Sequence, residues 1–89
     1  MNELEEARLV INEVDAEMAK LFCRRMDAVR HVAAYKQAHG LPILNAGREA
    51  EVIARNAAQV PAEYRPYYEE FLRREMALSK EFQATLLDK

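Results

Sequence analysis

Two basic residues, Arg25 and Lys36, stand where a long predicted helix is otherwise apolar. Residues 3–37 contain neither Pro nor Gly, and at about 100° per residue their apolar side chains gather on one broad stripe. This apolar stripe comprises Leu4, Ala7, Ile11, Val14, Met18, Leu21, Phe22, Val29 and Val32. Lys and Arg are rarely buried without a negative partner. Because the stripe places no matching acid beside these two cations, the pattern predicts a binding site for an anion.

Polar residues also interrupt the inward faces of two later predicted helices. Arg48 and Glu49 come one turn before the apolar pair of a short helix, so they point toward its buried side. Ser79 and Gln83 lie one turn apart on the apolar face of a third helix. Arg8 falls at the edge of the apolar stripe of the first helix.

Each of these residues, taken alone, has an ordinary structural explanation. Arg25 could pair with an acid such as Asp15 of a partner chain, and Lys36 could extend to solvent from its helix end. Arg48 and Glu49 could be exposed residues of a first helical turn. The hydroxyl and amide of the third helix could form local hydrogen bonds, and an arginine at the stripe's edge is solvated by default.

Taken together, four cations with one acid predict a pocket suited to a small dianion. The cations are Arg8, Arg25, Lys36 and Arg48. The pattern contains no clear nucleophile, no metal-ligand spacing and no Ser/His/Asp arrangement, so we expect neither a metal nor a cofactor. An enzyme built in this way would act by positioning its substrate and by electrostatic stabilisation.

The elements that must position these residues are three helices, long, short and long, in a single all-α domain spanning residues 1–89. The predicted helices cover about 3–38, about 46–58 and about 66–87. Asn2 and Asn45 are expected to cap the first two helices, and Pro66 suits the first turn of the third. No strand-like alternation or internal repeat is present.

Length, charge and cysteine content predict an oligomeric cytoplasmic protein. A compact chain of 89 residues has a radius of gyration of about 12 Å, whereas the first helix would run to about 54 Å. Its apolar stripe must therefore meet a partner, and we expect a homodimer. A net charge of −2 with interspersed signs argues against nucleic-acid binding, and no apolar run approaches the about 20 residues that span a membrane. The single cysteine, Cys23, excludes an internal disulfide.

The sequence resembles the all-helical chorismate mutases of the AroQ class, over nearly the whole chain. The resemblance rests on an ordered set of motifs: Arg8, Ile11–Asp15, Arg24–Met26, Tyr35–Lys36, Leu41–Ile43, Arg48–Glu49, Val52–Ile53, Ser79 and Gln83. It implies an intertwined homodimer whose two sites each draw on both chains. It also implies the Claisen rearrangement of chorismate to prephenate, on the route to phenylalanine and tyrosine. The compact length resembles that of monofunctional bacterial enzymes.

The resemblance further implies how the substrate carboxylates are held. Arg25, Arg48 and Ser79 would bind them, and Arg8 would reach into the site from the partner chain.

The resemblance assigns the reacting atoms to other residues. Lys36 and Gln83 would bind the ether oxygen whose bond to carbon breaks, and Glu49 would accept a hydrogen bond from the ring hydroxyl. Asn45 stands where many relatives carry Asp. Asparagine can still cap the second helix, so we expect activity to survive this difference.

Two related enzymes and one non-catalytic role remain as alternatives. Isochorismate-pyruvate lyases share the fold and the basic pocket, and the segment Arg24–Asp27 is reminiscent of them, although the connector and the Arg48–Glu49 pair favour a mutase. A mutase acting on an amino analogue of chorismate is a less favoured third enzyme. A non-catalytic helical module would explain a dimer, but would leave Lys36 and Gln83 without a purpose.

Overall fold

The computed structural model describes residues 2–87, which form three α-helices. The helices are α1 (Glu3–Ala38), α2 (Ala46–Ala57) and α3 (Arg65–Leu87), and no strand occurs within residues 2–87. The predicted all-α, long-short-long architecture is confirmed, although α2 ends and α3 begins one residue earlier than expected. No helix in this range combines the length and apolarity needed to cross a membrane.

The ends of α1 are set by local side-chain and backbone chemistry. The Asn2 side-chain oxygen accepts a hydrogen bond from the Glu5 backbone N–H at 2.8 Å, which satisfies one free donor of the first turn. At the other end, His39 caps the helix, and Gly40 adopts a positive φ of 65° that a residue with a Cβ rarely tolerates. The chain then leaves α1 through a connector of residues 39–45.

The turn between α2 and α3 is held by Arg65. Its Nε donates to the carbonyl of Ala57 at 2.9 Å, and its Nη2 donates to the carbonyl of Val60 at 3.0 Å. Carbonyls at a helix end lack intrahelical partners and attract positive charge. The guanidinium at the start of α3 therefore fastens the end of α2 to the helix that follows it.

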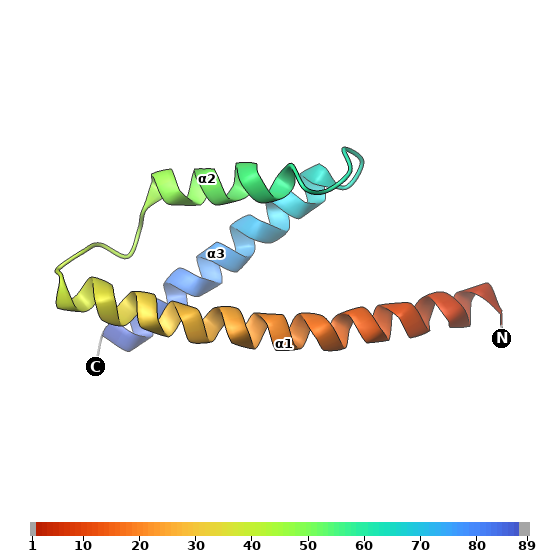
Figure 1. The fold of residues 1–89 in the computed structure, drawn as a ribbon, viewed down its shortest axis with the longest axis horizontal. Coiled ribbons are helices and arrows are strands. Elements are labelled where there is room, and N and C mark those ends of the chain that lie inside the picture. The colour runs from red at the N-terminus through yellow and green to blue at the C-terminus, as the bar shows by residue number, and fades with distance from the viewer. Residues whose placement is uncertain (1, 88–89) are drawn as a thin grey trace.

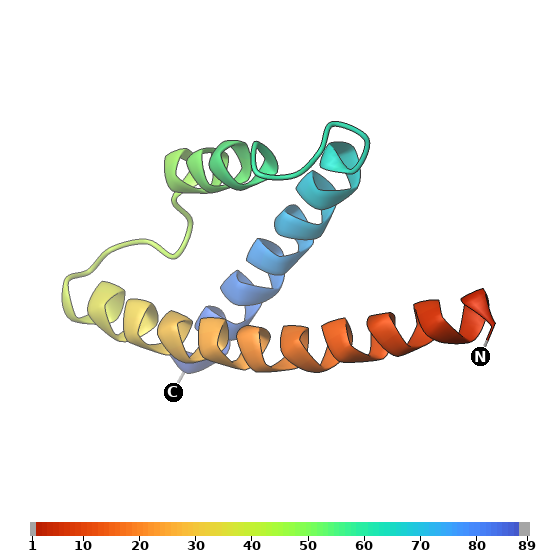
Figure 2. The ribbon, with the colours of Figure 1, turned by 45° about the vertical axis from the view of Figure 1, so that its right-hand side comes forward.

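Helix α3 packs against both other helices and occupies the middle of the fold (Figure 1). Within residues 2–87, α1 and α2 do not pack directly on each other, and the turned view shows the same separation (Figure 2). The chain is elongated, with a longest dimension of 55 Å and a radius of gyration of 16.3 Å. A compact chain of this length would have a radius of gyration of about 12 Å.

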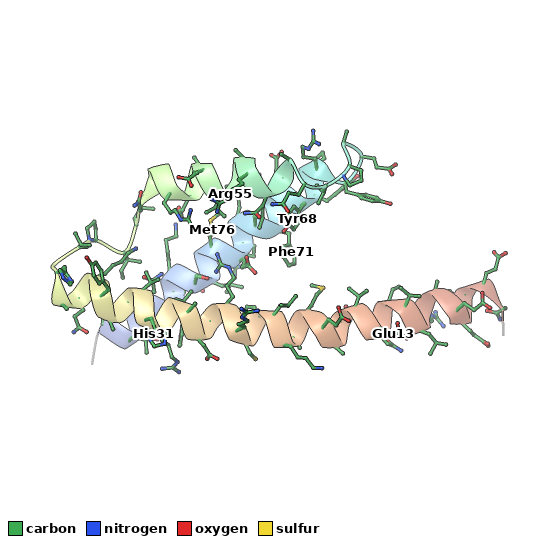
Figure 3. All side chains as sticks on the ribbon, in the orientation of Figure 1. Glu13, His31, Arg55, Tyr68, Phe71 and Met76 are labelled. Carbon is green, nitrogen blue, oxygen red and sulfur yellow. The ribbon has the colours of Figure 1, made fainter. Side chains whose placement is uncertain are left out.

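The N-terminal part of α1 extends beyond the other two helices. The ribbon around Glu13 lies on this uncovered arm, whereas Met76 lies where α3 meets α2 (Figure 3). Most of the predicted apolar stripe is exposed in the single chain; Leu4, for example, retains 57% of its accessible surface. The buried residues of α1 are Val29 and Ala33, both in its C-terminal half. An apolar face of this extent is typical of a protein–protein interface.

The buried face of α3 follows a helical repeat. Leu72, Met76, Ser79 and Gln83 are its buried residues, spaced by four, three and four positions. Two of the four are polar, as the sequence pattern predicted for this face. Burial of a hydroxyl and a carboxamide beside the apolar pair places hydrogen-bonding groups inside the fold, where they can define a site.

Candidate active site

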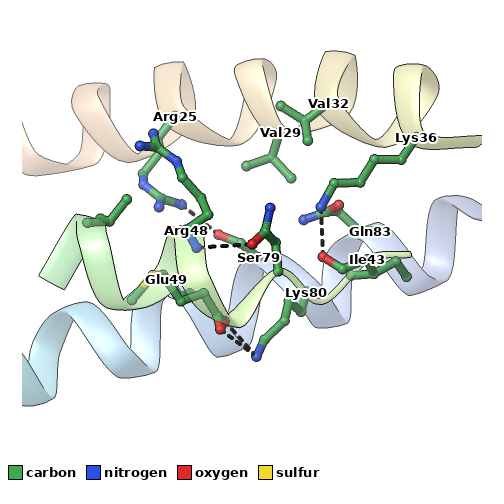
Figure 4. A pocket seen from close by; sticks show the side chains of 13 residues that line it. Arg25, Val29, Val32, Lys36, Ile43, Arg48, Glu49, Ser79, Lys80 and Gln83 are labelled. Carbon is green, nitrogen blue, oxygen red and sulfur yellow. Dashed lines mark hydrogen bonds and ion pairs between the residues drawn. The ribbon is translucent and has the colours of Figure 1, made fainter. Parts of the chain in front are cut away.

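A cavity of about 200 Å³ lies between the three helices (Figure 4). Its apolar lining comes from Val29, Val32, Ile43, Val52 and Met76. Seven of the eight residues that the sequence predicted for the site also line it: Arg25, Lys36, Asn45, Arg48, Glu49, Ser79 and Gln83. Residues far apart in the sequence, on α1, α2 and α3, therefore face one cavity.

Arg25 is anchored from α3 by two groups. Its Nη1 donates to the Ser79 hydroxyl at 2.7 Å, and its Nε lies 3.1 Å from a carboxylate oxygen of Glu75. The expectation that Arg25 lacks a matching acid is thus wrong. The acid belongs to the same chain, rather than being Asp15 of a partner. Glu75 lies one turn before Ser79, so one face of α3 supplies both contacts and orients the guanidinium.

Lys36 turns back toward the connector. Its ammonium group donates to the backbone carbonyl of Ile43 at 2.7 Å, and the side chain is half-buried. This contact ties the last turn of α1 to the segment that leads into α2. Because both residues line the cavity, Lys36 places a positive charge at the cavity wall instead of extending into solvent.

Gln83 carries a buried acceptor without a donor. The residue retains 6% of its accessible surface, and its side-chain oxygen has no hydrogen-bond partner among the described residues. Buried polar groups in folded proteins nearly always have a partner, and leaving one unpaired costs about 1–3 kcal/mol. The carboxamide lines the same cavity as Lys36 (Figure 4). Its oxygen can therefore accept from a ligand's donor, and its NH2 group can donate to a ligand's acceptor.

The first turn of α2 is held by Asn45. Its side-chain oxygen accepts a hydrogen bond from the Arg48 backbone N–H at 3.0 Å, which confirms the predicted cap. The Arg48 guanidinium is exposed and lies 3.2 Å from Glu51, a contact within the same helix. Asn45 therefore acts on the site through the backbone, because the residue it caps, Arg48, and the next, Glu49, both line the cavity.

We expect the cap to tolerate a carboxylate but not a methyl group. Asn45→Ala should lower the free energy of unfolding by about 1 kcal/mol, because α2 has only 12 residues and loses a first-turn acceptor. Asn45→Asp keeps an acceptor at the same place and should unfold at nearly the wild-type urea concentration. Urea unfolding of both variants measures the difference. An unchanged midpoint for Asn45→Ala would contradict this role.

Glu49 is paired across the fold with Lys80, which is not among the residues predicted for the site. The Lys80 ammonium lies 2.7 Å from one carboxylate oxygen of Glu49, and both residues line the cavity. The signal was present in the sequence. Lys80 comes four residues after Met76 and three before Gln83, a spacing that places it beside the buried face of α3.

Arg8 is the predicted site residue that the single chain does not bring to the cavity. It is exposed on the uncovered arm of α1 and is not among the residues that line the cavity. Its entry from a partner chain stays a prediction. Arg24 and Asp27, the residues reminiscent of a lyase, are also exposed and outside the cavity lining. Within residues 2–87, no group of three or more His, Cys, Asp or Glu side chains is placed to hold a metal ion.

The arrangement suits binding of a small dianion. It also suits stabilisation of one further ligand atom on which negative charge develops during a reaction. Arginine guanidinium groups bind carboxylates in a defined plane, and a lysine supplies a compact charge. Lys36 and the Gln83 carboxamide can both donate hydrogen bonds to such an atom. The apolar lining lowers the local dielectric, which strengthens these interactions.

Comparison with known proteins agrees with this chemistry. Residues 7–84 match the protein family described as chorismate mutase type II. No match was found among the curated proteins or among the solved structures. The matched range contains α1 from Ala7 onward, all of α2, α3 up to Ala84 and every residue of the cavity lining.

Proposed function

Because this chain belongs to the chorismate mutase type II family, we propose that it catalyses the rearrangement of chorismate to prephenate. The observation that carries the proposal is the gathering of Arg25, Lys36, Arg48 and Gln83 around one cavity. Chorismate has two carboxylates and an ether oxygen, so three cations and an amide donor match its polar groups. The rearrangement moves electrons within one molecule and requires no proton transfer.

The arginines supply conformational restriction in this proposal. Arg25, whose guanidinium is oriented by Ser79 and Glu75, and Arg48, from the first turn of α2, each bind a carboxylate. Holding both carboxylates brings the enolpyruvyl side chain over the ring and close to the carbon with which it forms a bond. Binding energy thereby offsets the entropic part of the activation barrier.

Lys36 and Gln83 stabilise the transition state more than the bound ground state in this proposal. As the ether C–O bond lengthens, negative charge grows on its oxygen, and the ammonium and carboxamide N–H groups interact with it more strongly than in the ground state. The burial of Gln83 supports this role, because a donor shielded from water loses little to competing hydrogen bonds. Glu49 accepts a hydrogen bond from the ring hydroxyl and so fixes the orientation of the ring.

We further propose that the active form is a homodimer in which Arg8 of one chain completes the site of the other. The exposed apolar stripe supports this arrangement. Two apolar hollows of about 450 and 460 Å³ around Phe22 and Phe71 also support it, because side chains of a second copy can fill them. Such an enzyme would act in the cytoplasm and supply prephenate for phenylalanine and tyrosine synthesis.

Product analysis tests the reaction directly. The purified protein is incubated separately with chorismate and with isochorismate, and we expect prephenate from the former and no pyruvate from the latter. Arg25→Ala, prepared in the same way, controls for contaminating activity. Pyruvate release from isochorismate would instead identify a lyase. Absence of chorismate binding by calorimetry would favour a non-catalytic helical module.

A further inference from the structure

The Lys80–Glu49 ion pair differs from the exposed ion pairs of the chain. The Lys80 ammonium lies 2.7 Å from one Glu49 oxygen and 3.3 Å from the other, so it faces both oxygens of the carboxylate. The pair joins α3 to α2, and the two side chains retain 36% and 24% of their accessible surface. By contrast, Arg73 and Glu69 form an i,i+4 pair on one helix, and the Arg73 side chain is more than half exposed.

The Lys80–Glu49 pair affects the charge that the cavity presents to a ligand. Glu49 is the one carboxylate in the cavity lining within residues 2–87, beside the cations Arg25, Lys36, Arg48 and Lys80. A free carboxylate there would repel a dianionic substrate and would also attract the arginines away from it. Lys80 contacts that carboxylate directly, so Glu49 does not draw the three other cations of the lining away from a ligand.

We propose that Lys80 is a positioning residue that holds and neutralises the Glu49 carboxylate, an inference that rests on the proposed mutase function. The ammonium approaches from α3, and its contacts with both oxygens restrict rotation of the carboxylate about its terminal bond. Glu49 then presents a fixed acceptor to the ring hydroxyl without adding repulsion toward the two substrate carboxylates. Lys80 itself makes no contact with substrate in this arrangement.

If Lys80 acts through Glu49, the effect of replacing Lys80 on KM should depend on whether residue 49 carries a negative charge. Lys80→Met should raise the KM for chorismate roughly tenfold, since it leaves an uncompensated carboxylate beside a dianion. Lys80→Arg keeps a cation and should recover most of the affinity. In a Glu49→Gln background there is no carboxylate left to neutralise, so adding Lys80→Met should change KM less than twofold.

A four-variant cycle tests this dependence. KM and kcat are measured for the wild type, Lys80→Met, Glu49→Gln and the double variant, and chorismate affinity is measured by calorimetry as a second readout. Circular dichroism establishes that each variant folds. Arg73→Met is the matched control, because it removes an exposed ion pair of the same helix and should leave KM unchanged.

The outcomes separate this inference from the proposed function. A rise in KM for Lys80→Met that disappears in the Glu49→Gln background, with recovery in Lys80→Arg, supports positioning. An equal rise in both backgrounds would show that Lys80 binds substrate itself and would overturn the inference, as would an unchanged KM for Lys80→Met. In these cases the wild type is active, so the mutase function stands. A wild-type protein that neither converts nor binds chorismate would contradict both the proposed mutase function and the role of Lys80.

Discussion

Replacing Gln83 with Glu should convert a nearly flat pH–activity profile into one that falls as the pH rises. In the proposed mechanism the Gln83 amide donates a hydrogen bond to the ether oxygen, and no step requires a proton to move. A carboxyl group at this position can donate only while it is protonated. Once ionised, it repels the negative charge that grows on the oxygen, so the variant should be most active in acid.

The matched variant, Gln83→Ala, separates loss of the donor from addition of a charge. It should lose about 10²-fold or more in kcat at every pH, as is typical when one transition-state donor is removed. Measurements of kcat between mildly acidic and mildly alkaline pH compare the two variants with the wild type. A Gln83→Glu protein with the wild-type profile would show that the side chain does not touch the reacting oxygen.

Mixing two inactive variants should restore activity if Arg8 acts in the partner's site. Arg8→Ala and Arg25→Ala should each lose about 10²-fold or more in activity, because each removes a carboxylate-binding cation. In a heterodimer, one site then receives the native Arg25 of one chain and the native Arg8 of the other. Random pairing makes about half of the dimers mixed, so about a quarter of the sites and of the wild-type activity should return.

A second mixture provides the control. Arg25 and Lys36 lie on the same helix and line the cavity of the same chain. A heterodimer of Arg25→Ala and Lys36→Ala therefore contains no site with both native residues, and no activity should return. Subunits are exchanged by unfolding and refolding the variants together before the assay. Recovery in neither mixture would mean that each site is built from one chain.

The helices were predictable because their signals are local. Asn2 and Asn45 cap helices as expected, and the Gly40 turn ends α1 where the sequence suggested. Periodicity also placed Ser79 and Gln83 on the buried face of α3, since residues three or four positions apart share a helix face.

Contacts between helices were harder to predict. The sequence pattern predicts no acid beside Arg25, yet Glu75 of α3 pairs with it. Periodicity does not reveal that Lys80 pairs with Glu49, 31 positions away in the sequence. Helical periodicity tells which residues share a face, but not which residue of another helix meets them. That depends on the crossing point and axial shift of the two helices, which side-chain packing decides.

In the proposed mechanism, the separation of α1 from α2 would make a bound substrate part of the scaffold. Arg25 and Lys36 come from α1, whereas Arg48 comes from α2, and these two helices do not pack on each other within residues 2–87. A dianion held by both helices therefore acts as a cross-link between them. Ligand that binds only the folded chain adds about 2.7 kcal/mol of stability at 100 times its Kd. This linkage opposes local unfolding of α2, so the backbone amides of this short helix become slower to exchange with solvent whenever the site is occupied.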